Sequence, residues 1–281
     1  MELYRQHRPK DWDEVIGQSA AVKQLRGYCD SGDIPRVLLF AGPTGVGKTS
    51  LARILKRKLH CKGTDWKEIN CGSVESPIDT VRIIENEMTK SALHGKNRCF
   101  LLDECHALTR SKYSQEALLK VLEDGPDRNP NAYFILCTTD PERLIKTIRG
   151  RCTQIYLKPL VAADMAVLID RVLVAERKST GADVVERIIE AADGSARDAL
   201  QMLGKVIQHK DAKDQLAAVQ AVGAKQQAIE LARALINPRG KWETVKGILT
   251  GLDGEDPEGL RRMILGYASS VVLNGGGLAG R

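Results

Sequence analysis

The spacing of hydrophobic and polar positions divides the chain into two parts of different character. Short apolar runs at 36–41, 99–102 and 132–137 have the length of buried strands, and segments with helical spacing such as QEALLKVLED lie between them. Strands that alternate with helices predict an α/β fold, in which helices cover a parallel sheet.

After Lys158-Pro159 only helical spacing continues. It predicts helices at about 162–177, 183–192 and 196–209, and three more toward Trp242 and Ile264. This change of character predicts a core domain at 1–158, a small helical domain at 159–210, and a second helical domain at 211–281, complete or truncated.

A helix break precedes the predicted helix at 196–209. Asp193 and Gly194 interrupt the helical spacing, and Ser195 offers a hydroxyl N-cap. We therefore expect Arg197 in the first turn of the helix that follows.

Composition sets only broad limits on the class of protein. The 281 residues are 43% hydrophobic and 28% charged, which is typical of a soluble globular protein and excludes collagen-like, disordered and membrane chains. No stretch approaches the roughly 18 apolar residues of a membrane span, and the start MELYRQHRPK lacks the apolar region of a secretory signal. We expect a cytoplasmic protein, in a bacterium or a phage-infected host. The net charge of +6 would favour a polyanionic partner but decides nothing alone.

The cysteines are odd in number, form no CxxC pair, and fall in several places within apolar runs. This pattern favours buried, reduced thiols rather than a disulfide framework. The seven are Cys29, Cys61, Cys71, Cys99, Cys105, Cys137 and Cys152.

A glycine-rich loop lies between the first apolar run and a helical segment. The pattern Gly42-x4-Gly47-Lys48-Thr49 is a P-loop in the strand-loop-helix context that it requires. Its glycines allow successive N–H groups to face phosphates, Lys48 neutralises them, and Thr49 offers a hydroxyl to Mg²⁺. The residues expected to bind the nucleotide here are Gly42, Pro43, Thr44, Gly45, Val46, Gly47, Lys48, Thr49 and Ser50.

A P-loop needs a carboxylate at the end of a neighbouring strand. Asp103 follows the run CFLL and is the expected Mg²⁺ residue. Glu104 comes next and is the expected general base, which polarises the attacking water. The alternative is that both acids only favour the start of a helix through its dipole.

DECH at 103–106 also resembles the DExH box of superfamily-two helicases. Those enzymes build their ATP site between two RecA-like domains. Because the strand-like runs end at 158, the helicase interpretation requires sequence that this chain does not contain.

The run from CFLLDECH through CTTDPERLIKTIRGRC resembles the bacterial gamma/tau clamp-loader subunit and, more loosely, replication factor C small subunits, which are AAA+ ATPases. The resemblance covers about residues 1–208. It begins with YRQHRPKDWDEVIGQ, which is similar to the clamp-loader N-terminus that lies near adenine. By this resemblance the base pocket includes Arg5, Pro9, Val15 and Ile16.

The same resemblance assigns three further site residues. Thr139 is at the sensor-1 position, which orients the attacking water, and Arg197 is at the sensor-2 position. Arg151 matches the arginine finger that one subunit inserts into its neighbour's site, although here Gly150 replaces the serine of the family's Ser-Arg-Cys motif. Arg149 is a rival for the finger.

The family also implies partners: a sliding clamp, primer-template DNA, and other subunits in a ring, expected to be a pentamer. The resemblance implies a core ATPase domain, a helical lid at 159–210 and an oligomerising collar at 211–281. Candidates for DNA contact through backbone phosphates are Arg82, Arg110 and Lys112.

One departure from the gamma/tau pattern concerns zinc. That family inserts a four-cysteine module after the P-loop helix, whereas this chain has only Cys61 and Cys71 there. Two thiolates do not complete a tetrahedral zinc site, so we expect ATP and Mg²⁺ as cofactors and no zinc. In this respect the chain resembles replication factor C or a phage-encoded clamp loader.

Three functions stay open at this point. The first is an ATP-hydrolysing clamp-loader subunit. The second is a non-hydrolysing stator subunit of the same assembly, which the complete P-loop disfavours. The third is another AAA+ DNA motor, such as a branch-migration ATPase or a helicase loader.

Overall fold

The computed structural model describes 2–110, 112–209, 211, 214–216, 218–219, 228–232, 234–235, 242–252 and 257–273. Within these ranges the side chains of 110, 126, 251, 258–259, 266 and 269–273 are not described. Contacts between Cα atoms divide the chain into two compact units, Met1–Val172 with Asp193–Leu200, and Leu173–Ala192 with Gln201–Arg281. The three-part division at 158 and 210 is a different partition and stays a prediction.

A five-stranded parallel sheet forms the centre of the first unit, with the order β2-β3-β4-β1-β5. Its strands are β1 (Val37–Ala41), β2 (Trp66–Asn70), β3 (Arg98–Asp103), β4 (Ala132–Thr138) and β5 (Thr153–Tyr156). The predicted α/β fold is confirmed. The carboxyl ends of all five strands lie at one edge, where ligands bind in open α/β sheets.

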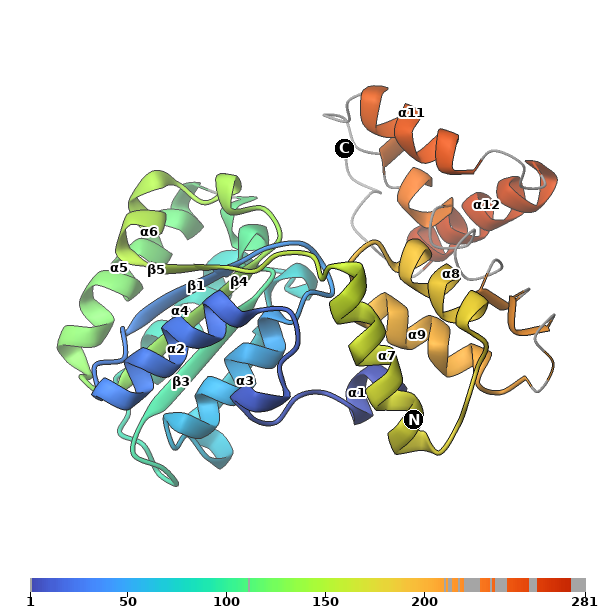
Figure 1. Ribbon diagram of the computed structural model, residues 1–281. Helices are drawn as coiled ribbons and strands as arrows, with labels where there is room; N and C mark the ends of the chain where they lie inside the picture. The colour runs from blue at the N-terminus through green and yellow to red at the C-terminus, as the bar shows by residue number, and fades with distance from the viewer. Residues whose placement is uncertain are drawn as a thin grey trace. The chain divides into compact units, whose positions relative to one another are not determined.

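Helices cover both faces of this sheet (Figure 1). The α-helices are α1 (Leu3–Gln6), α2 (Ser19–Ser31), α3 (Lys48–Lys58), α4 (Pro77–Met88), α5 (Lys112–Arg128) and α6 (Lys146–Arg151). The 3₁₀ turns are η1 (Trp12–Glu14), η2 (Gly63–Asp65), η3 (Cys71–Ser73), η4 (Cys105–Arg110) and η5 (Pro141–Arg143).

Side chains that alternate along the strands build two cores. Leu38 and Phe40 of β1 pack with α2 and α3, whereas Val37 and Leu39 pack with α4, α5 and α6. Every residue of β1 and β4 is buried, so both faces of these central strands are covered. This explains their unbroken apolar sequences, which a parallel sheet requires.

Two strands are absent from the prediction because both are edge strands with mixed burial. β2 reads WKEIN and β5 reads TQIY, and neither is an apolar run. No strand follows Tyr156 in the described part of the chain, so a second RecA-like sheet is not found there.

The remaining helices are α7 (Ala162–Glu176), α8 (Ala182–Ala192), α9 (Ala196–Val206), α11 (Trp242–Gly251) and α12 (Pro257–Leu273). The division into units falls within α7 and within α9. In the second unit Leu231, Val245 and Leu252 form a small core, against which Leu260 and Ile264 pack. Among the described residues, no helix has both the length and the apolar character needed to cross a bilayer.

The expectation that all cysteines are reduced is wrong for one pair. Cys61 and Cys99 form a disulfide between the segment after α3 and the start of β3. Their separation of 38 residues gives no local sequence signal, and only the packing of α3 on the sheet brings them together. The other five cysteines are free thiols, and all but Cys29 are buried.

Candidate nucleotide-binding site

The glycine loop joins β1 directly to α3, as the sequence predicts. Gly45 has a positive φ of 78°, and a Cβ there would lie 2.0 Å from Oγ of Ser195. A Cβ on Gly42 would lie 2.4 Å from the carbonyl oxygen of Leu157. The fold therefore approaches this loop so closely that only glycine fits at these two positions.

Lys48 is buried at the start of α3, with 6% of its surface exposed. Its Nζ donates hydrogen bonds of 2.7 Å to the carbonyl oxygens of Gly42 and Pro43. Burial lowers the pKa of Lys48 below its ordinary value, and the carboxylates of Glu104 and Asp103 oppose that shift. The ammonium group thus lies against the loop whose phosphate ligand it is predicted to neutralise.

The two predicted Mg²⁺ residues are in contact. Oγ1 of Thr49, in the first turn of α3, donates a 2.9 Å hydrogen bond to Oδ2 of Asp103 at the end of β3. A hydroxyl and a carboxylate are oxygen donors of the kind that Mg²⁺ takes, while it keeps several waters and touches substrate phosphates. The residues present therefore fit this ion.

Glu104 follows Asp103 and adopts a left-handed backbone conformation with a φ of 53°. Its Oε2 accepts a 3.4 Å hydrogen bond from Oγ1 of Thr139, the residue directly after β4. The predicted base and the predicted sensor-1 residue are therefore brought together at the carboxyl edge of the sheet.

Arg197 lies in the first turn of α9, as the helix break predicts. Asp193 and Gly194 both have positive φ, and Oγ of Ser195 caps the helix by accepting a 3.3 Å bond from the Asp198 N–H. The N–H of Arg197 donates to the carbonyl oxygen of Gly45 at 3.4 Å. The start of α9 is thus held against the phosphate loop.

Residues 38–160, which carry this loop and both acids, match the family described as ATPase family associated with various cellular activities (AAA). The parallel sheet, the phosphate loop and the two acids of this chain therefore have the AAA fold. The match ends two residues into the segment predicted as the lid, so it contains the phosphate loop and both acids but not Arg197.

Relatives of this chain include subunits of DNA polymerase III. DNA polymerase III subunit tau of Escherichia coli is 31% identical over 263 residues, covering 85% of this chain and 40% of the relative. DNA polymerase III subunit gamma of Buchnera aphidicola is 31% identical over 222 residues, covering 72% of this chain and 60% of the relative. The predicted resemblance to the clamp-loader family is confirmed, although the chain spans less than two thirds of these relatives.

Among solved structures, the RuvB Holliday junction branch migration motor of Thermotoga maritima is similar, with a TM-score of 0.63. It is 21% identical, and the match covers 94% of this chain and 91% of RuvB. At this identity the likeness shows the shared fold alone.

The two finger candidates of the AAA domain lie at the end of α6 and differ in exposure. Arg151 is 57% exposed and forms a 2.6 Å ion pair with Glu123 of α5. Arg149 is 26% exposed, pairs with Glu142 at 2.7 Å, and has a buried Nε without a partner. Arg151 therefore offers the more accessible guanidinium, while the choice between them stays a prediction.

The N-terminal residues predicted to line the base pocket differ in burial. Pro9, Val15 and Ile16 are half-buried, whereas Arg5 is exposed and contacts Glu2 and Tyr4. The Tyr4 ring lies 5.9 Å from the Arg197 guanidinium, which brings α1 near the start of α9.

Two residues in this segment were not predicted. Gln18 is buried, and its Nε2 donates to the carbonyl oxygens of Lys158 at 2.7 Å and Val46 of the loop at 3.4 Å. Burial lowers the pKa of Arg8, and the charges of Arg53 and Arg197 lower it further. No sequence motif marks these contacts, although Gln18 directly follows the turn at Gly17, whose φ is positive.

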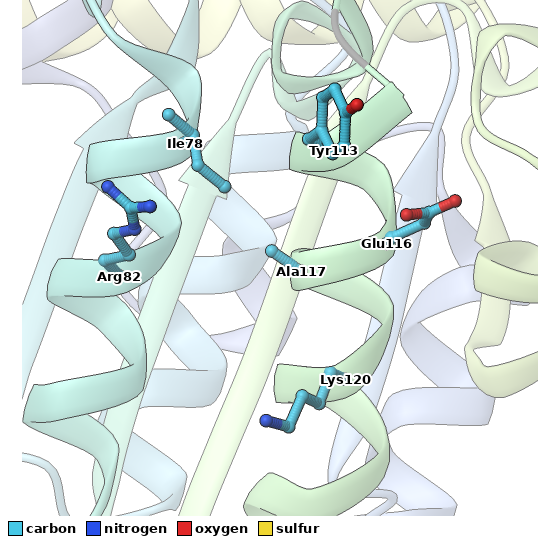
Figure 2. Close-up of a pocket in the computed structure, with 6 residues that line it drawn as sticks. All are labelled: Ile78, Arg82, Tyr113, Glu116, Ala117 and Lys120. Carbon is cyan, nitrogen blue, oxygen red and sulfur yellow. The ribbon is translucent and has the colours of Figure 1, made fainter.

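Of the candidate DNA contacts, Arg82 lies on α4, Arg110 ends η4 and Lys112 begins α5. Arg82 pairs with Asp79 at 3.1 Å, and Lys112 lies 3.8 Å from Glu116. The side chain of Arg110 lies outside the described residues. A groove of about 550 Å³ separates the two helices, and Figure 2 shows the residues that line it: Ile78, Arg82, Tyr113, Glu116, Ala117 and Lys120.

The segment between α3 and β2 differs from a zinc module in its cysteines. Cys61 is bonded to Cys99, and Cys71 is a buried thiol. Within the described residues, no group of three or more His, Cys, Asp or Glu side chains is placed to hold a metal ion. The expectation of no zinc stays a prediction.

Proposed function

We propose that this chain is an ATP-hydrolysing subunit of a replication clamp loader, which opens a sliding clamp and loads it onto primer-template DNA. The observation that carries the proposal is the contact of Thr49 with Asp103, beside the pair formed by Glu104 and Thr139. These are the parts that hydrolysis needs, in a chain similar to the gamma and tau subunits over most of its length.

Each residue has a defined part in the proposed reaction. N–H groups of the glycine loop and the amino end of α3 face the phosphates, and Lys48 neutralises them. Thr49 and Asp103 would hold Mg²⁺, which when bound neutralises charge on the β- and γ-phosphates. Glu104 takes a proton from water as the water oxygen bonds to the γ-phosphorus, the bond to the β-phosphate oxygen breaks, and ADP leaves.

In this proposal Arg197 and Arg151 bring positive charge to a nucleotide site only when the lid or the neighbouring subunit is in place. Arg197 contacts the loop from the start of α9, so its guanidinium would link the nucleotide to the proposed lid at 159–210. Arg151 would enter the site of the next subunit, so hydrolysis would depend on assembly through the proposed collar at 211–281.

The decisive experiment compares wild type with Glu104→Gln. Glutamine keeps the size of the side chain but cannot act as a base, so turnover should fall by about 100-fold or more while ATP affinity stays the same. The measurements are steady-state ATPase activity and equilibrium binding of ATP.

ATPase assays with and without the proposed partners distinguish the three functions. With companion subunits, primed DNA and the cognate clamp, a clamp-loader motor should hydrolyse ATP faster than with any component missing. ATP binding without turnover in that assembly would indicate a stator. Stimulation by DNA without clamp binding would indicate another AAA+ DNA motor.

A further inference from the structure

Two side chains converge on one oxygen of Glu104. Oγ1 of Thr139 donates to Oε2 at 3.4 Å, and Nδ1 of His106 lies 3.4 Å from the same Oε2. Both contacts therefore restrain the carboxylate through Oε2 and leave Oε1 to accept a proton from water.

His106 is itself held at the end of the central strand β4. Its Nδ1 lies 3.0 Å from Oγ1 of Thr138, a residue with no exposed surface. That hydroxyl oxygen also accepts a 3.0 Å hydrogen bond from the N–H of Asp140, which fixes its position. The side chain of His106 is 18% exposed, so the ring has little freedom to turn away.

The acceptors around Nδ1 select one tautomer of the ring. An ionised carboxylate only accepts hydrogen bonds, whereas a hydroxyl accepts or donates. With the proton on Nδ1, the ring donates toward Thr138 and Glu104 together. With the proton on Nε2, a lone pair would face the carboxylate anion, which is unfavourable. The geometry thus favours a donor aimed at Glu104.

The backbone conformation of Glu104 is unusual and is held by further contacts. A φ of 53° is uncommon for a residue with a Cβ, and such conformations persist where surrounding contacts impose them. Here the N–H of Glu104 donates to Oδ1 of Asp103, and its carbonyl oxygen accepts from the N–H of Ala107. Glu104 directly precedes the helical turn η4, and the contacts of His106 and Thr139 restrain its carboxylate.

We propose that His106 is a positioning residue for Glu104, which holds the base at the end of β4 in register with Thr139. The proposal rests on the proposed function, in which Glu104 is the general base. His106 acts only through Glu104 and does not touch ATP. Its loss should therefore lower kcat and leave the KM for ATP unchanged.

The test uses two substitutions of His106 and one control substitution elsewhere, all in the complete assembly. His106→Leu fills the space but removes the donor, and kcat should fall about 10-fold, which is the range of one hydrogen bond to a charged group. His106→Asn places an amide N–H near the position of Nδ1 and should keep kcat within about 3-fold of wild type. His94→Ala, an exposed histidine in the loop before β3, is the matched control and should change nothing.

A double substitution distinguishes positioning from a general structural role. If His106 acts through Glu104, His106→Leu should have no further effect in a Glu104→Gln background. Independent, multiplicative losses in the double variant would overturn the proposal. So would a wild-type kcat in His106→Leu, or a raised KM together with a lowered melting temperature in both His106 variants.

Failure of the proposed function has a different result. If wild type in its assembly binds ATP but does not hydrolyse it, or if Glu104→Gln turns over normally, Glu104 is not the base, and the positioning role is lost with it. If Glu104→Gln fails as expected and His106→Leu is normal, only the positioning role is wrong.

Discussion

The phosphate site differs from the exposed arginines and lysines of α4, α5 and α6 in burial and in its contacts within the chain. At the phosphate site Lys48 is buried, and the contact of Thr49 with Asp103 lies between two elements 54 residues apart. By contrast, Lys112 is 88% exposed and Arg151 is 57% exposed, each with a single acidic neighbour. The first region is assembled within one chain, whereas the residues of the second are proposed to act on a partner.

The largest expected effect tests the dependence on a partner. Arg151→Ala should lower kcat by about 1,000-fold in the complete assembly, which is the low end for an arginine finger acting on a neighbouring site. ATP binding by the isolated chain should be unchanged, because Arg151 contacts Glu123 rather than the loop. The measurements are turnover of the assembly and binding of ATP to the single chain.

Two controls sharpen that result. Arg26→Ala, on α2, removes an exposed ion pair with Asp13 of η1 and should leave turnover intact. Arg149→Ala should lower the melting temperature through loss of its pair with Glu142. If Arg149→Ala abolishes turnover in a folded assembly and Arg151→Ala does not, the two roles are exchanged.

The second effect concerns the region that one chain completes alone. Lys48→Ala should weaken ATP binding by the isolated chain by about 100-fold, because it removes a buried charge-assisted hydrogen bond to phosphate. Lys58→Ala, at the other end of α3 and paired with Asp11, is the control and should bind normally. Equal affinity of both variants, measured by calorimetry, would show that nucleotide does not bind against this loop.

The smallest expected effect is on the free energy of unfolding, and it comes from a comparison of a buried carboxylate with an exposed ion pair. Asp65 is 1% exposed, and its carboxylate accepts three backbone hydrogen bonds of 2.7 to 2.8 Å, from Leu93, His94 and Gly95. Burial alone would raise the pKa of Asp65, but these three donors outweigh it, and the pKa falls below its ordinary value. Asp65→Asn should lower the free energy of unfolding by about 1–2 kcal/mol at pH 7, because its NH₂ cannot accept from them.

The pH dependence of this loss has a defined sign. Since the folded-state pKa is lowered, Asp65 stabilises the fold fully above its ordinary pKa of about 3.9, and the contribution disappears as the pH falls through the lower folded-state pKa. Denaturant unfolding should show wild type and Asp65→Asn converging in acid. Glu116→Gln, which breaks the exposed contact with Lys112, should match wild type throughout, and a gap that persists in acid would contradict this account.

Features that the sequence predicted well are those in which one local pattern determines both position and chemistry. The glycine loop could be placed because its neighbours are a fully buried strand and a helix. Asp103 and Glu104 could be placed because Asp103 ends another buried strand and Glu104 follows it. Arg197 could be placed because Asp193, Gly194 and Ser195 mark the helix start.

Features that were missed depend on packing between distant segments. The pairing of Cys61 with Cys99, the contacts of Gln18 with Val46 and Lys158, and the electrostatics of Arg8 have no local pattern. The edge strands β2 and β5 carry polar residues because only part of their surface is covered. Such edge strands can be recognised only from the structure, after the central strands have been placed.

Strand β4 lies between β1 and β3 and therefore separates the phosphate loop after β1 from the acids at the end of β3. Neighbouring strands are separated by about 4.8 Å, so the loop after β1 and the acid after β3 start about 10 Å apart, with the width of one strand between them. Thr138 ends this strand and contacts His106, and Thr139 follows it and donates to Glu104. Because Thr138 has no exposed surface, a bulkier side chain at that position is expected to displace His106 and, through it, the carboxylate of Glu104. In the proposed function this would slow hydrolysis without altering a residue proposed to touch the nucleotide.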